Sequence, residues 1–268
     1  MSRIEQNLTA RATADRKGFI PFVTAGDPDL ESSLAICLKL AELGADVIEL
    51  GVPFSDPMAD GPTIQRSSQR ALEKGVNLHD VLDLAKGFRA ASDVPIVLFS
   101  YFNPILAMGL KTFATAARDA GIDGVLLTDV IDAEAADISR GLAEHDIDLI
   151  SLVAPTTTDE RLEQICSHAR GFIYAVSRAG VTGARETVSG AAENLVARTR
   201  QFTDLPIAVG FGISTAEQIA DVWRFADAAV VGSAIVAEIE KHQDDAVAAV
   251  DRFVSGLLPS FAKAGAES

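Results

Sequence analysis

The stretch ADVIELGVPFSDPMADGP, residues 45–62, joins an apolar run to a loop that is rich in carboxylates. Its first half has the composition of a buried strand, and the glycines and prolines that follow mark turns. Glu49 lies inside the apolar run, where burying an ionised carboxylate without a partner would cost a free energy on the order of several kcal/mol. Glu49 must therefore be paired, kept protonated or used in chemistry.

The helix-to-strand junction that precedes this stretch recurs along the chain. ELGAD, DAGIDG and EHDID each combine a helix end, a turn and an acidic residue before an apolar run. Eight such runs are expected as strands, at residues 19–24, 46–50, 95–100, 124–128, 148–153, 172–177, 206–210 and 228–232. Helical patterns are expected at residues 31–44, 63–75, 78–92, 111–121, 133–145, 159–170, 191–202 and 215–225. Capping-box spacing predicts helix starts at Thr157 with Glu160 and at Ser214 with Glu217.

The alternation predicts an α/β fold of the (β/α)8 TIM barrel type. Continuously apolar strands indicate a parallel sheet that is buried on both faces, and 268 residues suit one barrel domain over 1–268. Two ordinary domains are the weaker alternative. An open doubly wound sheet predicts a glycine-rich fingerprint after the first strand, where the chain reads TAGDPD. Residues 1–17 are expected to form a helix that caps the barrel bottom, and residues 262–268 a frayed tail.

Composition restricts the partners and the compartment. A net charge of −15 argues against nucleic acid or an anionic membrane as a partner. The two cysteines, Cys37 and Cys166, lie on apolar sides of expected helices and predict buried free thiols in a reducing compartment. The N-terminus lacks the apolar core of a signal peptide, so we expect a cytoplasmic protein.

In a barrel of this kind, catalytic groups follow the carboxyl ends of the strands. The candidates at those positions are Asp27, Glu49, Asp56, Asp60, Asn103, Asp129, Tyr174, Arg178 and Arg185. The four histidines fall in expected helices or at their ends, without metal-ligand spacing, so we expect no metal site. Carboxylates remain as the expected general acid and base.

Glycine-containing turns follow the last three expected strands, in SRAGVTGAR, GFGIS and VGSAI. Such loops frequently hold a phosphate in barrel enzymes, and Gly212, Gly232 and Ser233 fit that role. The loop of residues 178–190 combines glycine hinges with Arg178, Thr182 and Arg185, which is typical of a closing lid.

Five motifs together resemble the tryptophan synthase alpha subunit family. PFVTAGDP, IELGVPFSDPMADGPTIQ, NPI, SRAGVTGAR and VGFGIS match that family in order and spacing over essentially the whole chain. The resemblance implies a (β/α)8 barrel that cleaves indole-3-glycerol phosphate to indole and glyceraldehyde 3-phosphate in L-tryptophan biosynthesis. It implies no cofactor in this chain and an alpha2beta2 complex with a beta subunit that depends on pyridoxal phosphate.

The resemblance also assigns residues. It implies that Glu49 and Asp60 are catalytic, and that substrate contacts come from Tyr174, Thr182, Phe22, Phe211, Gly183, Gly212, Gly232 and Ser233. Asp56, Asp129 and Arg178 are expected to face the partner. One departure is Ile131 in TDVI, where many relatives have a proline that fixes the backbone of a loop facing the beta subunit.

The chemistry of this cleavage agrees with the surroundings expected for the two carboxyl groups. Desolvation should raise the pKa of Glu49 so that it acts first as acid and then as base. Asp60 should stay ionised and stabilise positive charge on the indole nitrogen.

The alternatives are a free-standing indole-producing lyase, a sugar-phosphate isomerase or an indole-glycerol-phosphate synthase. The synthase would need a lysine acid on a strand, and a non-catalytic regulatory barrel would be expected to lose Glu49 or Asp60 first.

Overall fold

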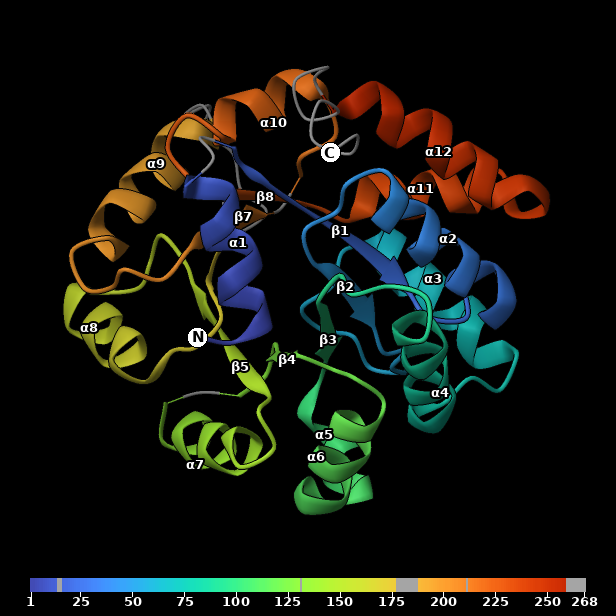
Figure 1. Cartoon of the computed structure of the whole chain (residues 1–268), viewed down its shortest axis with the longest axis horizontal. Coiled ribbons are helices and arrows are strands. Elements are labelled where there is room, and N and C mark those ends of the chain that lie inside the picture. Colours follow the sequence, from blue (N-terminus) through green and yellow to red (C-terminus); the bar gives the residue numbers. More distant parts are fainter. Residues whose placement is uncertain (14–15, 131, 177–187, 211, 259–268) are drawn as a thin grey trace.

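The computed structural model describes residues 1–13, 16–130, 132–176, 188–210 and 212–258. Within these ranges, parallel strands in chain order close a barrel in which the last strand pairs with the first (Figure 1). The strands are β1 (Gly18–Thr24), β2 (Ile48–Gly51), β3 (Ile96–Ser100), β4 (Gly124–Leu127), β5 (Asp148–Val153), β6 (Ile173–Val176), β7 (Ile207–Gly210) and β8 (Ala228–Val231). The predicted TIM barrel is confirmed, and the closed pairing excludes an open doubly wound sheet.

Helices surround the barrel and begin or end within a few residues of the predicted positions. They are α2 (Leu30–Glu42), α3 (Pro62–Glu73), α4 (Leu78–Arg89), α6 (Leu110–Asp119), α7 (Asp132–Ala143), α8 (Asp159–His168), α9 (Val188–Thr199) and α10 (Ala216–Val222). Each buries apolar side chains against the strands because its apolar residues recur at helical spacing.

Three helices were not predicted as such: α5 (Phe102–Met108), α11 (Ser233–Lys241) and α12 (Ala246–Leu257). α5 is only seven residues long, too short for a clear period, and contains the NPI motif. The VGSAI segment was expected to be a turn, but only Gly232 remains outside regular structure and α11 begins at Ser233.

Both predicted capping boxes are wrong by one residue. The N-cap of α8 is Thr158, whose hydroxyl accepts from the Arg161 N–H, while Thr157 accepts from Ala154 in the preceding turn. The N-cap of α10 is Thr215, which forms a capping box with Gln218. Adjacent hydroxyl residues offer two possible starts at each place. The Thr157 hydroxyl is engaged in the preceding turn and the Ser214 hydroxyl donates to the Gln218 side chain, so the following threonine caps each helix.

The N-terminal helix α1 (Arg3–Thr13) lies at the bottom of the barrel. Its Ile4 and Leu8 are buried in the same cluster as the inward side chains of the strands. There is room because Gly18 and Gly124 lack side chains: a Cβ on Gly18 would lie 2.9 Å from Leu8, and one on Gly124 would lie 2.9 Å from Ile4. Residues 262–268, expected as a frayed tail, lie outside the described residues.

The outer core lies between the strands and the helices. It includes Cys37 and Cys166, which are buried free thiols as predicted. In the described ranges, no helix combines the length and the apolar character that a membrane crossing requires.

An ion network ties α3 and α11 to the end of β1. Arg70 on α3 donates two hydrogen bonds to the buried carboxylate of Asp27, both at 2.8 Å, and a third to Glu240 on α11 at 2.8 Å. Arg66, one turn earlier on α3, also pairs with Glu240. Because α3 and α11 both begin at the carboxyl ends of the strands, this network fixes two helices whose first residues border a cavity there.

Candidate active site

A cavity of about 290 Å³ opens at the carboxyl ends of the strands. Strand residues and loop residues contribute to it together. Its lining contains Phe22, Glu49, Asp60, Gly61, Pro62, Thr63, Ile64, Phe99, Tyr174, Gly212, Val230, Gly232 and Ser233. The barrel thus brings residues of β1, β2, β3, β6 and β8 to one small space, as its closed topology requires.

Glu49 lies in the middle of β2, opposite Phe22 on β1 and Val97 on β3. Only 1% of its surface is exposed, and its Oε1 has no hydrogen-bond partner among the described residues. Burial raises the pKa of Glu49 to about 8. Glu49 is therefore mostly protonated near neutral pH. Its side chain borders the cavity, where the proton can be transferred.

Asp60 ends the loop after β2 and is held by Tyr101, which sequence reasoning missed. The Tyr101 hydroxyl donates to Asp60 Oδ2 at 3.2 Å and accepts from the Ala59 N–H at 2.8 Å. Its ring stacks on Phe54 with a centroid distance of 4.9 Å. Burial raises the pKa of Asp60 to about 6, and the hydrogen bond from Tyr101 opposes that rise. Asp60 is therefore mostly ionised at neutral pH.

Aromatic rings form the apolar wall of the cavity. Phe22 and Phe99 meet edge to face, with centroids 5.4 Å apart and ring planes at 81°. The Phe22 ring fits because Gly51 has no side chain: a Cβ there would lie 2.5 Å from Phe22 Cζ. Phe99 was not among the predicted site residues, although its place on β3 at the same level as Gly51 is a usable signal.

Tyr174 contributes a buried hydroxyl from β6. Burial and the nearby Glu49 raise the pKa of Tyr174 well above its usual value. Tyr174 is therefore a neutral hydrogen-bond donor at any ordinary pH. The hydroxyl lies against Gly210 of β7, where a Cβ would overlap it.

Another part of the cavity lining is suited to an anion. Gly212, Gly232 and Ser233 line it, and α11 begins at Ser233. Helix N-termini present free backbone N–H groups and the positive end of the helix dipole. Gly212 has φ 78°, a left-handed conformation that glycine adopts readily.

Several predicted site residues do not line this cavity. Asp27 is paired with Arg70, Asp56 is exposed and accepts from the Ser55 hydroxyl at 2.6 Å, and Asn103 is exposed on α5. Asp129 is exposed and accepts from the first N–H of α5, that of Phe102, at 2.8 Å. The predictions for Arg178, Thr182, Gly183, Arg185, Phe211 and Ile131 concern positions outside the described residues.

The described part of the chain holds no group of three or more histidine, cysteine, aspartate or glutamate side chains that could hold a metal ion. The arrangement in the cavity supports proton transfer by one carboxyl group, charge stabilisation by another, and anion binding at a helix end.

Residues 8–262 match the model of a family described as tryptophan synthase alpha chain. The chain belongs to this family. The tryptophan synthase alpha chain of Geobacter sulfurreducens is 49% identical over 241 residues, which cover 90% of this chain and 91% of that protein. The alpha chain of Thioalkalivibrio sulfidiphilus is 46% identical over 265 residues, which cover 98% and 99%.

Solved structures of tryptophan synthase alpha chains have the same fold. The subunit from Legionella pneumophila superposes with a TM-score of 0.88 at 36% identity, covering 96% of this chain and 97% of that one. A chain from Pyrococcus furiosus, in a structure described as showing mutual activation of the tryptophan synthase a2b2 complex, has a TM-score of 0.84 at 41% identity. The similarity covers 90% of this chain and 97% of that one.

Membership confirms the resemblance found in the motifs. The tryptophan synthase alpha chain is a lyase of tryptophan biosynthesis, and it cleaves indole-3-glycerol phosphate. The sugar-phosphate isomerase and the indole-glycerol-phosphate synthase are therefore no longer candidates.

Proposed function

We propose that Glu49 carries the proton transfers of indole-3-glycerol phosphate cleavage. In its protonated form it donates to the indole carbon that bears the glycerol chain, which leaves a positive charge on the ring nitrogen. As the carbon–carbon bond breaks, its electron pair returns to the ring. The carboxylate of Glu49 then takes the proton of the adjacent side-chain hydroxyl, whose carbon becomes the aldehyde of glyceraldehyde 3-phosphate.

In this mechanism Asp60 stabilises the positive charge that develops on the indole ring during this step. An ionised carboxylate near the ring N–H stabilises the positive nitrogen of the protonated intermediate. The pKa of about 6 for Asp60 keeps it ionised at neutral pH, while the pKa of about 8 for Glu49 keeps the acid available. Different surroundings thus give two carboxyl groups in one cavity two roles.

The rest of the cavity supports the same orientation of substrate. Phe22 and Phe99 offer apolar surface to the flat indole ring. The first N–H groups of α11 and the Ser233 hydroxyl can bind the phosphate. The single observation that carries the proposal is the buried carboxyl of Glu49, which borders this cavity and whose Oε1 has no hydrogen-bond partner among the described residues.

We further propose that the chain works in the cytoplasm with a beta subunit in an alpha2beta2 complex. Pyridoxal phosphate belongs to that partner, and the alpha reaction needs no cofactor here. The Pyrococcus furiosus relative, of which an a2b2 complex is described, supports the proposed complex. So do two exposed apolar side chains, Met58 (93% exposed) and Leu106 (58% exposed), which lie in segments that Tyr101 connects. Asp56, two residues before Met58, and Asp129, which accepts from the Phe102 N–H of α5, are also exposed.

The experiment that tests this function is indole release from indole-3-glycerol phosphate by the purified chain, alone and with a beta subunit. We expect slow release that rises sharply when the partner is added. Fast release without any response to the partner would indicate a free-standing lyase. No indole under either condition would contradict the assignment.

A further inference from the structure

A hydrogen bond joins Asp129 to the start of α5, and the proposed chemistry does not use it. Asp129 follows β4, and its Oδ1 accepts from the Phe102 N–H, the first of α5, at 2.8 Å. The N-cap position of α5 is Tyr101, whose side chain makes no capping bond to the helix. An aspartate from another loop therefore takes the place of an N-cap side chain, a role for which aspartate is favoured.

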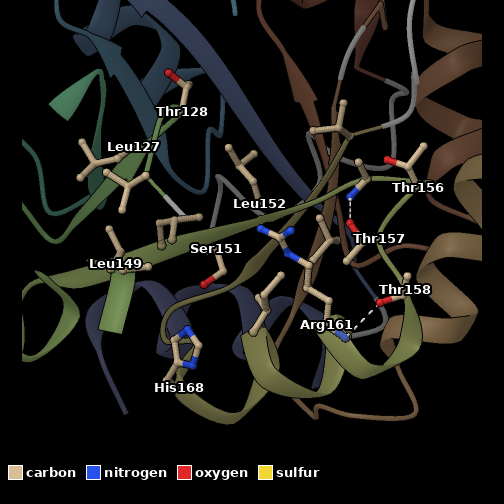
Figure 2. A pocket seen from close by; sticks show the side chains of 17 residues that line it. Leu127, Thr128, Leu149, Ser151, Leu152, Thr156, Thr157, Thr158, Arg161 and His168 are labelled. Carbon is tan, nitrogen blue, oxygen red and sulfur yellow. Dashed lines mark hydrogen bonds between the residues drawn. The ribbon is translucent and has the colours of Figure 1, made fainter. Parts of the chain in front are cut away.

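The segment that follows β4 has open space on the side of β5. Thr128 and Val130 line a cavity of about 580 Å³ there (Figure 2). On the side of β3, the Thr128 N–H donates to the Ser100 carbonyl at 3.2 Å, and Asp129 accepts from the first N–H of α5. This segment and the start of α5 therefore support each other across the edge between β3 and β4.

Tyr101, directly before α5, holds the loop that carries Asp60. Its hydroxyl accepts from the Ala59 N–H at 2.8 Å and donates to Asp60 Oδ2 at 3.2 Å. Its ring stacks on Phe54, and the residue is buried. A shift of the Tyr101 backbone would therefore move a hydroxyl that contacts the loop at two adjacent residues.

We propose that Asp129 is a positioning residue for Asp60, acting through the start of α5 and Tyr101. Two hydrogen bonds, at 2.8 Å to the Phe102 N–H and at 3.2 Å between Tyr101 and Asp60, lead from an exposed carboxylate to the active-site cavity. α5 is only seven residues long, so it has little stability of its own with which to fix its first turn. The importance of this link for the reaction rests on the proposed role of Asp60, whereas the link itself does not.

The sign of the expected effect separates this link from the charge of Asp129. Loss of a nearby negative charge lowers the pKa of a carboxyl group. Loss of the hydrogen bond from Tyr101 raises the pKa of Asp60, because that bond opposes the effect of burial. Glu49 and Tyr174 are the other titratable groups in the lining of the cavity, and they are the same in every variant of the test.

The test is a carbon-13 NMR titration of the full chain with labelled aspartate carboxyl groups, in which Asp60→Asn identifies the Asp60 signal. Asp129→Ala should raise the pKa of Asp60 by about half a unit, less than Tyr101→Phe does, because the hydroxyl is loosened rather than removed. The double variant should match Tyr101→Phe, because both changes act on the same hydrogen bond. Asp129→Asn keeps an acceptor oxygen without the charge, so it should not raise the pKa.

Asp29→Ala is the matched control. Asp29 caps α2 by accepting from the Ser32 N–H at 2.7 Å, so its loss removes the same kind of bond elsewhere and should leave the pKa of Asp60 unchanged. A raised pKa in Tyr101→Phe without any rise in Asp129→Ala would overturn the proposal, and so would an equal rise in Asp129→Asn. Asp129 is exposed, so its variants keep the packed core.

Indole release by the same variants separates the link from the proposed function. It is measured without a beta subunit, so that no contact between Asp129 and a partner affects the result. The acidic limb of kcat/KM should move with the pKa of Asp60 measured by NMR. A raised pKa with an unmoved limb would contradict the proposed role of Asp60 in the reaction and would leave the link from Asp129 intact.

Discussion

At the scale of single residues, the two carboxyl groups of the active-site cavity differ in their surroundings. Glu49 is enclosed by strand side chains, and its pKa rises to about 8, while Asp60 keeps a hydrogen bond from Tyr101 and has a pKa of about 6. Activity that needs protonated Glu49 and ionised Asp60 should have a bell-shaped pH dependence with limbs near these values. The pair therefore sets the working pH range.

Tyr101→Phe should move the acidic limb. The substitution keeps the ring against Phe54 but removes the hydrogen bond that lowers the pKa of Asp60, so that pKa should rise by about one unit. On the acidic side, activity would therefore be lost at a higher pH in the variant than in the wild type. The measurement is kcat/KM for indole release between pH 5 and pH 9, and an unmoved acidic limb would show that Asp60 is not the group titrating there.

Glu49→Gln should change the pH dependence of stability. The carboxyl group titrates near 4.5 in the unfolded chain and near 8 in the folded one, so between these values only the folded chain holds the proton. The unfolding free energy of the wild type should fall with rising pH across that window, by at most about 1.4 kcal/mol per unit, and level off above it. The glutamine variant lacks this slope.

Urea unfolding of both proteins at pH 5, 6.5 and 8 measures the effect. The difference in unfolding free energy between Glu49→Gln and wild type should grow in favour of the variant as pH rises. Parallel curves for the two proteins would mean that Glu49 is not buried as an acid in the folded chain.

The sequence predicted part of this site at residue scale. Glu49 stood out because a carboxylate in an apolar run has to be explained, and Asp60 because it follows the same strand. Tyr101 was missed because its bond to Asp60 joins residues 41 positions apart, a contact that only the closed barrel creates. Phe99 was missed because an apolar residue in a strand looks the same whether it borders a cavity or a core.

At the scale of elements, α11 connects the barrel to the cavity, because it begins directly where β8 ends. Its first residue, Ser233, borders the cavity, and its last turn carries Glu240, which Arg70 on α3 holds. The helix end that is proposed to bind phosphate is thus fixed by an ion pair almost two turns away.

Ser233→Asp should weaken substrate binding. A carboxylate at the first position of α11 repels the phosphate, so KM should rise at least about tenfold while kcat changes less. The control is Gln243→Glu, which adds the same charge just beyond the other end of α11, on an exposed residue. Steady-state indole release gives both constants, and equal KM values for the two variants would argue against phosphate binding at this helix end.

Elements with long patterns were predictable and short ones were not. The eight strands were evident from apolar runs bounded by turns, and the long amphipathic helices from their period. α5 has seven residues and its start is fixed by Asp129 from the next loop, so its own sequence carries little signal. The cap positions of α8 and α10 depended on which of two neighbouring hydroxyl residues was engaged elsewhere, and the sequence does not show that.

At the scale of the whole molecule, stability and chemistry lie at opposite ends of the barrel. α1 fills the bottom with Ile4 and Leu8, and Arg3 pairs with Asp123 there at 2.7 Å. The carboxyl ends of the strands carry the cavity, the anion-binding helix end and the exposed apolar residues proposed to face a partner. The barrel can therefore hold a destabilising buried carboxyl at one end because packing elsewhere compensates.

The central claim is that one buried carboxyl group performs both proton transfers. The most direct measurement is the rate of indole release from saturating indole-3-glycerol phosphate by wild type and by Glu49→Gln, each with a beta subunit. Circular dichroism first establishes that both are folded. We predict that kcat falls by roughly 10²–10⁴ in the variant, the usual contribution of a general acid and base, with little change in KM. A variant that keeps kcat within about threefold of wild type would contradict the account.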